Sequence, residues 1–255
     1  MRPLPLSPTF WSSKHALLRI SQRNVVAALC TALNFALFHN IVVHAQTIEP
    51  VVVEYKGKAS GRFEITNHGL APMAVILEPR SFSVGLDGRA IYRPLDPTTH
   101  VDLSTMSFRI APQQSYYVFY KAHADTLPAW FTVYADLAST QKEDGLKLRI
   151  MLPHTVYLYQ PKPISKNAIH IQQAAFMTHA DTVICDLDNT SSSLVRVQNV
   201  LAVGGKASAQ ANGFPLLPHS QRHLEIPWKQ KNPPSYVLLR FPHFVVKEPL
   251  SVKDE

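Results

Sequence analysis

The sequence predicts an all-β fold of two immunoglobulin-like β-sandwich domains in tandem. Short runs of β-branched and aromatic residues recur between turn residues from Thr47 onward, at the spacing of sandwich strands. The 20 prolines argue against long helices. Hydrophobic residues make up 46% of the chain and charged residues 17%, which supplies a core and excludes a disordered chain. The 255 residues are enough for two domains of ordinary size.

The first 45 residues are typical of a secretory signal peptide. Lys14, Arg19 and Arg23 precede an apolar run from Val25 to Val43. Small side chains at positions 43 and 45 predict cleavage after Ala45. An uncleaved membrane anchor is the alternative, because the run approaches the roughly 20 residues that span a bilayer. Polar side chains interrupt the run, and the cleavage pattern favours the signal peptide.

Charge and cysteine content narrow the class of protein further. The chain has 25 Lys+Arg and 18 Asp+Glu, and the leader contributes four of the basic residues and no acid, so the mature chain has 21 against 18 and a net charge of +3. This balance argues against a nucleic-acid partner. Cys30 lies in the leader, which leaves Cys185 alone in the mature chain without a partner for an intramolecular disulfide. The chain must therefore hold together through its cores.

The first predicted domain covers residues 46–161. Turn residues such as Asn67 and Gly69 separate its apolar runs, and Pro112 precedes its central aromatic run. The expected strands, in order, are Val51–Tyr55, Gly61–Thr66, Met73–Glu78, Tyr116–Tyr120, Trp130–Tyr134 and the long run Leu146–Tyr159.

The second predicted domain covers residues 162–255. Pro161 and Pro163 make a stiff, extended connector between the two domains. About 90 residues follow, which suits one sandwich. The expected strands, in order, are Ala168–Gln172, Thr182–Leu187, Leu194–Asn199, His223–Ile226, Tyr236–Phe241 and Phe244–Val246.

The long run at the end of the first domain alternates strictly. Four apolar residues share one face of the predicted strand, namely Leu146, Leu148, Ile150 and Leu152, and Lys147, Arg149 and Met151 share the other. In one interpretation the apolar face only fills its own sandwich. In the other, the strand lies at an edge and offers alternate side chains to a second chain. Pro153, which lacks an N–H donor, is expected to end the alternation and favours the edge position.

Three local patterns suggest chemistry, and each has a simpler explanation. Asp186-Leu187-Asp188-Asn189-Thr190 matches the nucleophile motif of haloacid-dehalogenase-type phosphatases, but a strand running into an Asn-Thr-Ser turn explains it better. His219 and His223 lie too far apart on a strand to share one metal. Cys185 is expected to be an inert, buried thiol. The sequence therefore predicts no enzyme, no catalytic residue, no metal and no cofactor.

Several weak motifs follow one another along the chain, namely Phe63–Asn67, Phe108–Gln114, Val156–Pro161, Leu187–Ser191 and Leu217–Arg222. In their order these segments resemble the periplasmic pilus-assembly chaperones of the PapD-like family. They look like the Asn-ended second strand, the proline loop before the central strands, the proline that closes the first domain, and two turns of the second domain.

The resemblance implies a periplasmic chaperone that caps pilin-like fibre subunits by lending them a β-strand. That strand maps onto Leu146–Tyr159, with Leu146, Leu148, Ile150 and Leu152 as the donated side chains. The implied partners are fibre subunits and an outer-membrane usher, with no nucleic acid and no small-molecule substrate. A self-capped dimer is an alternative arrangement of the chain. A secreted structural or adhesion protein with the same fold is the alternative function.

The sequence departs from the family at the residues that bind the subunit's terminal carboxylate. The family usually has an Arg in the first strand and a Lys late in the donor strand, and the matching positions fall near Val51 and Val156. Arg149 or Lys147 could replace these cations from the same strand. Other candidates lie near the first strand, namely Lys56, Lys58 and Arg62. The remaining alternative is that the anchor is missing.

Overall fold

The computed structural model describes residues 45–140 and 149–254, and within them the all-β prediction is confirmed. The first ten strands are β1 (Thr47–Glu49), β2 (Val52–Lys56), β3 (Ala59–Asn67), β4 (Met73–Val84), β5 (Ala90–Pro94), β6 (Thr99–Leu103), β7 (Ser107–Ile110), β8 (Gln114–Ala124), β9 (Ala129–Ser139) and β10 (Arg149–Tyr159). A single 3₁₀ turn, η1 (Lys166–Ala168), is the only helical segment in these ranges. None of the described residues forms a helix long and apolar enough to cross a membrane.

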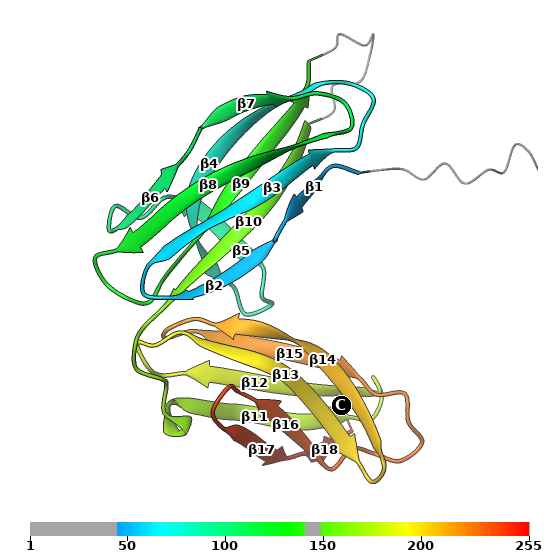
Figure 1. The fold of residues 1–255 in the computed structure, drawn as a ribbon. Coiled ribbons are helices and arrows are strands. Elements are labelled where there is room, and N and C mark those ends of the chain that lie inside the picture. The colour runs from blue at the N-terminus through cyan, green and yellow to red at the C-terminus, as the bar shows by residue number, and fades with distance from the viewer. Residues whose placement is uncertain (1–44, 141–148, 255) are drawn as a thin grey trace, which may run out of the picture. The chain divides into compact units, whose positions relative to one another are not determined.

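The strands β1 to β10 form two sheets that share one core (Figure 1). One sheet has the order β1-β3-β8-β6, and the other has the order β2-β10-β9-β4-β5 with β7 paired to β4. Alternate residues of β3 and β8 point inward against those of β4, β9 and β10, as period-two alternation requires. Phe63, Val118, Phe131 and Leu158 are fully buried at the centre of this core.

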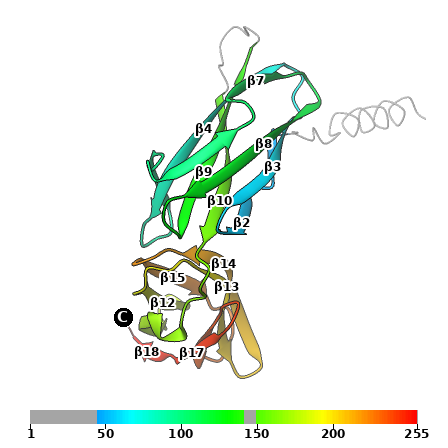
Figure 2. The same ribbon diagram turned by 60° about the vertical axis from the view of Figure 1, so that its left-hand side comes forward.

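The remaining strands are β11 (Ile169–Met177), β12 (Thr182–Asn189), β13 (Val195–Gly204), β14 (Ala207–Leu216), β15 (Gln221–Pro227), β16 (Tyr236–Arg240), β17 (Val245–Pro249) and β18 (Ser251–Lys253). They form a sheet of order β15-β12-β11-β18 and a second of order β14-β13-β16-β17 (Figure 2). Cys185, Val200, Trp228 and Leu239 are buried in the core that these sheets share. The described strands therefore make two sandwiches.

Each sandwich uses a buried asparagine at the end of a strand to fix a corner. Asn67 ends β3, and its side-chain amide donates to the carbonyl of Ala71 at 2.8 Å while its Oδ1 accepts from the backbone N–H of Gly69 at 3.0 Å. Asn189 ends β12 and does the same with the carbonyl of Ser193 at 2.8 Å and the N–H of Ser191 at 3.1 Å. Both side chains are fully buried, and they also donate to the buried carbonyls of Ile110, at 3.3 Å from Asn67, and of Leu217, at 2.9 Å from Asn189.

Several strands were not expected from the sequence, namely β1, β5, β6, β7, β14 and β18. Most are short terminal strands of their sheets with few β-branched residues. β14 is the exception, since it has ten residues. Its sequence is mostly Ala, Ser, Gln and Asn, which have little preference for strands, and only its pairing with β13 makes it a strand.

The structure does not test two of the expectations from the sequence, the signal peptide and the position of the domain boundary. The signal peptide, up to residue 44, lies outside the described residues. The domain boundary after residue 161 stays a prediction, and it falls in the segment between β10 and η1.

Candidate functional site

Strand β10 has a partner strand on one side along nearly its whole length and on the other side along only about half of it. β9 pairs antiparallel with residues Arg149 to Leu158 without a register shift. β2 pairs parallel with Thr155 to Tyr159 only. From Arg149 to His154, β10 therefore presents a free edge in the part of the chain that the structure describes.

The backbone groups on this edge follow from the hydrogen bond of Thr155. Its N–H donates to the carbonyl of Val51 at 2.7 Å, away from β9. Because alternate peptide groups of a strand point to the same side, those of Arg149, Met151 and Pro153 point to the free edge. Pro153 has no N–H, so the amides offered at this edge are those of Arg149 and Met151. Proline occupies here the edge position expected for it.

The inward side chains of β10 are apolar except that of His154. Ile150 and Leu152 are half-buried and pack against the first core, and Val156 and Leu158 are fully buried in it. The expectation that Pro153 ends the alternation is wrong, because Pro153 points outward and the register runs through it. Three residues of the candidate set, Leu146, Leu148 and Lys147, lie outside the described residues.

His154 occupies the inward position between Leu152 and Val156, and the sequence did not single it out. Its ring is fully buried and stacks on Phe63 with centroids 4.6 Å apart. Nδ1 lies 2.6 Å from the carbonyl oxygen of Pro50, so Nδ1 carries the proton and donates it. Nε2 is buried and finds no partner among the described residues. Burial lowers the pKa of His154 despite the Pro50 bond, so the ring is neutral.

Arg149, a candidate carboxylate anchor, points to the opposite face from Ile150 and Leu152. Its Nε lies 2.7 Å and 2.8 Å from the two carboxylate oxygens of Asp136 on β9. The guanidinium lowers the pKa of Asp136, mainly through this hydrogen bonding. Arg149 is therefore already paired within the chain, and it would have to give up Asp136 to bind a second carboxylate.

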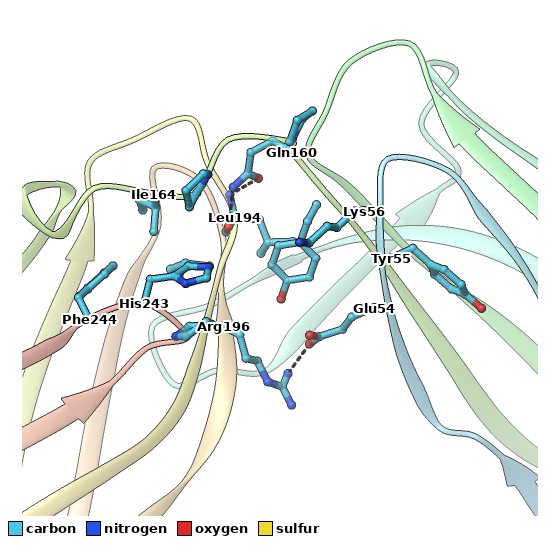
Figure 3. Close-up of a pocket in the computed structure, with 14 residues that line it drawn as sticks. Glu54, Tyr55, Lys56, Gln160, Ile164, Leu194, Arg196, His243 and Phe244 are labelled. Atoms are coloured by element: carbon cyan, nitrogen blue, oxygen red, sulfur yellow. Dashed lines mark hydrogen bonds and ion pairs between the residues drawn. The ribbon is translucent and has the colours of Figure 1, made fainter.

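A pocket of about 640 Å³ adjoins the other end of β10 (Figure 3). It is mostly apolar and lies between the ends of β2 and β10 and the loop and strand residues near Leu194 and Phe244. Glu54 and Arg196 form an ion pair at its wall, with 3.2 Å between Oε1 and Nη1. Gln160 spans the wall by bonding both the N–H and the carbonyl of Leu194.

Lys56 also lines this pocket, at the end of β2. Its side chain is exposed, and among the described residues no carboxylate forms an ion pair with it. Lys58 does not line the pocket, and Arg62 lies over the ring of Tyr117 on β3 and β8. Of the replacement cations considered for the carboxylate anchor, Lys56 is the one that lies free beside the strand.

The positions matched to the family's basic anchors do not suit a cation. Val156 is fully buried in the first core, where an unpaired charge would be strongly unfavourable. Val51 is half-exposed, and its carbonyl already accepts the Thr155 bond.

The other candidate chemistries lie on ordinary strand and turn positions of the second sandwich. β12 carries Asp186 and Asp188 and ends at Asn189 before a turn, which is the simpler interpretation of that motif. Nδ1 of His223 lies 2.5 Å from Oδ1 of Asp186, and this hydrogen bond raises the pKa of His223. His219 lies in a separate turn.

Cys185 is fully buried, and burial raises the pKa of its thiol to about 12. No group of three or more His, Cys, Asp or Glu in residues 45–140 and 149–254 is arranged to hold a metal ion.

Comparison of the sequence with models of protein families and with curated proteins finds no match. Comparison of the fold finds a chain of the complex between the Salmonella enterica SafA pilin and the SafB chaperone, with a TM-score of 0.53 and 13% identity, covering 82% of this chain and 97% of that chain. The YadV chaperone aligns with a TM-score of 0.50 and 11% identity, over 80% of this chain and all of the other. This chain has the fold of the PapD-like chaperones. The expectation drawn from the scattered motifs is thus confirmed at the level of fold.

Proposed function

We propose that this protein is a periplasmic chaperone that caps a fibre subunit by lending it the edge of β10. The observation that carries the proposal is the free edge from Arg149 to His154, which combines unpaired backbone groups with half-buried Ile150 and Leu152. A subunit that lacks a strand has an apolar groove and unpaired backbone groups, and such an edge covers both. The fold shared with the YadV chaperone and with a chain of the SafA–SafB complex supports this role.

In this proposal Ile150 and Leu152 are the donated side chains that lie within the described strand. They are only half-buried in the free chain, so a partner groove would cover the rest of their apolar surface. Leu146 and Leu148 extend the same alternating series in the sequence. The main-chain groups of Arg149 and Met151 would supply the ladder bonds to the subunit.

We further propose that Lys56 replaces the basic anchor that the family has and that this chain lacks at the matching positions. It lies in the pocket beside the end of β10, where Arg196 is already neutralised by Glu54. An ammonium group in a partly enclosed apolar pocket binds a carboxylate more strongly than one in bulk water. The terminal carboxylate of a subunit paired with β10 would be its ligand.

The test is co-purification of the mature chain, residues 46–255, from periplasmic extract, with partners identified by mass spectrometry. Met151→Pro removes an edge amide without touching the β9 ladder, whereas Met151→Ala keeps the amide and serves as the control. We expect a stoichiometric small β-rich subunit with the wild type and with Met151→Ala, and about tenfold weaker binding with Met151→Pro.

A complex retained in full by Met151→Pro would contradict strand donation. For the anchor, Lys56→Glu is compared with Lys58→Glu, which reverses a charge two residues away outside the pocket. Equal binding by both variants would contradict the role of Lys56. A chain that binds no subunit while fibre subunits are expressed would favour the structural or adhesive function.

A further inference from the structure

The free edge of β14 in the second sandwich is unusually open for pairing with another strand. β14 has ten residues and pairs only with β13, so the other side of Ala207–Asn212 has no strand beside it in the described structure. Natural proteins protect such edges with charges, prolines or short strands, because unpaired edges associate. From Ala207 to Gly213 this strand has none of these protections.

The other terminal strands of the described sheets are protected. β1 and β18 have three residues each, and β2, β5, β6, β7, β15 and β17 all carry charged side chains. β5, β15 and β17 also contain proline. Even the proposed donor edge of β10 contains Arg149 and Pro153. β14 also contains a proline, Pro215, but it lies beyond Ala207–Gly213, so this seven-residue segment is less protected than the edges of the other terminal strands.

The hydrogen-bond pattern shows which backbone groups the edge offers. The carbonyl of Val203 accepts from Ser235, on the side of β13 away from β14. The peptide groups of Ala202 and Gly204 therefore point toward β14, where they face Ala209 and Ala207. By the same alternation, those of Ser208, Gln210 and Asn212 point to the free edge.

We propose that this edge pairs antiparallel with the same edge of a second copy of the chain, with a two-fold axis at Gln210. In this register Gln210 faces Gln210 of the partner and Ser208 faces the partner's Asn212. Residues whose backbone groups point outward therefore face one another, as an antiparallel ladder requires. The exposed side chains that meet are uncharged and can exchange hydrogen bonds, so no like charges oppose the pairing.

Small side chains make the contact self-complementary on the other face as well. Ala209 would lie opposite Ala211 of the partner, and Ala207 opposite the partner's Gly213, so no bulky group holds the strands apart. The hairpin turn at Gly205, with φ of +59°, keeps β13 and β14 in register up to the end of the free edge. An isologous contact of this kind closes as a dimer and leaves β10 of each copy available.

The test uses the mature chain and measures its mass by sedimentation over a wide range of concentrations. We expect a reversible dimer, and about tenfold weaker dimerisation for Ser208→Lys/Asn212→Lys, because lysines then face lysines across the axis. Ser208→Glu/Asn212→Glu should weaken it similarly, and an equal mixture of the two double variants should dimerise again. Both positions are exposed, so the fold of the single copy is unaffected.

Gln210→Cys tests the register directly. Facing residues of a hydrogen-bonded antiparallel pair have Cα atoms about 5.5 Å apart, within the range of a disulfide. Mild oxidation should cross-link Gln210→Cys but not the control Ser60→Cys, which is exposed on β3.

A chain that stays monomeric at every concentration would overturn the proposal. The proposal would also be overturned if both charge variants still formed the dimer and Met151→Pro did not. That result would assign the contact to β10. Met151→Pro should weaken subunit binding and leave the β14 dimer unchanged. The proposal for β10 and the proposal for β14 can therefore be refuted independently.

Discussion

His154 should make the first sandwich sensitive to mild acid. Its ring is buried beside Phe63, and the environment lowers its pKa below the value of about 6.5 that it has in the unfolded chain. The native state therefore binds fewer protons than the unfolded state as the pH falls through 6.5. Stability is present above that pH and is lost below it, until the native pKa is reached.

The magnitude follows from linkage. One proton bound only by the unfolded state lowers the free energy of unfolding by about 1.4 kcal/mol per pH unit. Between about pH 6.5 and 5.5, His154 should therefore cost the sandwich up to about 1.0 kcal/mol, because the unfolded ring is already half protonated at the upper pH. His154→Phe keeps a ring against Phe63 and removes the titrating group, although it also leaves the carbonyl of Pro50 without its donor.

The assay is urea unfolding of the mature chain and of His154→Phe at both pH values, followed by tryptophan fluorescence. Trp130, on β9 of this sandwich, donates from Nε1 to the carbonyl of Phe82 and reports the transition. The wild type should lose up to about 1.0 kcal/mol more than the variant between the two pH values. The same pH dependence in both proteins would refute the reasoning, whatever their difference in absolute stability.

Three further outcomes follow from single contacts. Asn189→Ala should lower the free energy of unfolding by about 2–3 kcal/mol in denaturant titration, because the buried carbonyl of Leu217 loses its donor, and a loss below measurement error would contradict this. Gly213→Ala should cost about 1–3 kcal/mol by thermal unfolding, since a Cβ there would overlap the carbonyl oxygen of Gln198; an unchanged melting temperature would argue against so close an approach. Cys185 should not react with an aromatic disulfide reagent until the chain unfolds, because its thiol is buried and its pKa is raised to about 12.

Periodicity in the sequence predicted the strands that build the two cores, and the reason is physical. β-Branched and aromatic residues at period two have to be buried on one face, as in β9 and β12. The terminal strands β5, β6 and β7 bury little and carry no such pattern, so single-sequence reasoning missed them. For β14 a signal was present, because the Gly204-Gly205 pair between two runs is typical of a tight hairpin.

The candidate site could be predicted only in part. The alternating series located Ile150 and Leu152 on one face of a strand. It did not reveal the pairing of Arg149 with Asp136, because these residues meet only through the register of β9 and β10. The burial of His154 was missed for a similar reason: a polar side chain in an alternating run gives no sign that Phe63 and Pro50 will enclose it.

Pro153 bears on how long a lent strand stays in place. Each amide missing from the edge means one main-chain hydrogen bond fewer to break when the partner dissociates. Because differences in affinity among related complexes arise mostly in the dissociation rate, a missing bond would mainly speed dissociation. In the proposed complex, a subunit at the edge of β10 would lack the bond that any other residue at position 153 would offer. A competing strand with a full set of amides would hold the subunit by one more main-chain bond, which is worth about 1 kcal/mol. In the proposed complex, this single residue would therefore shorten the time for which a subunit stays bound, and the side chains would supply most of the specificity.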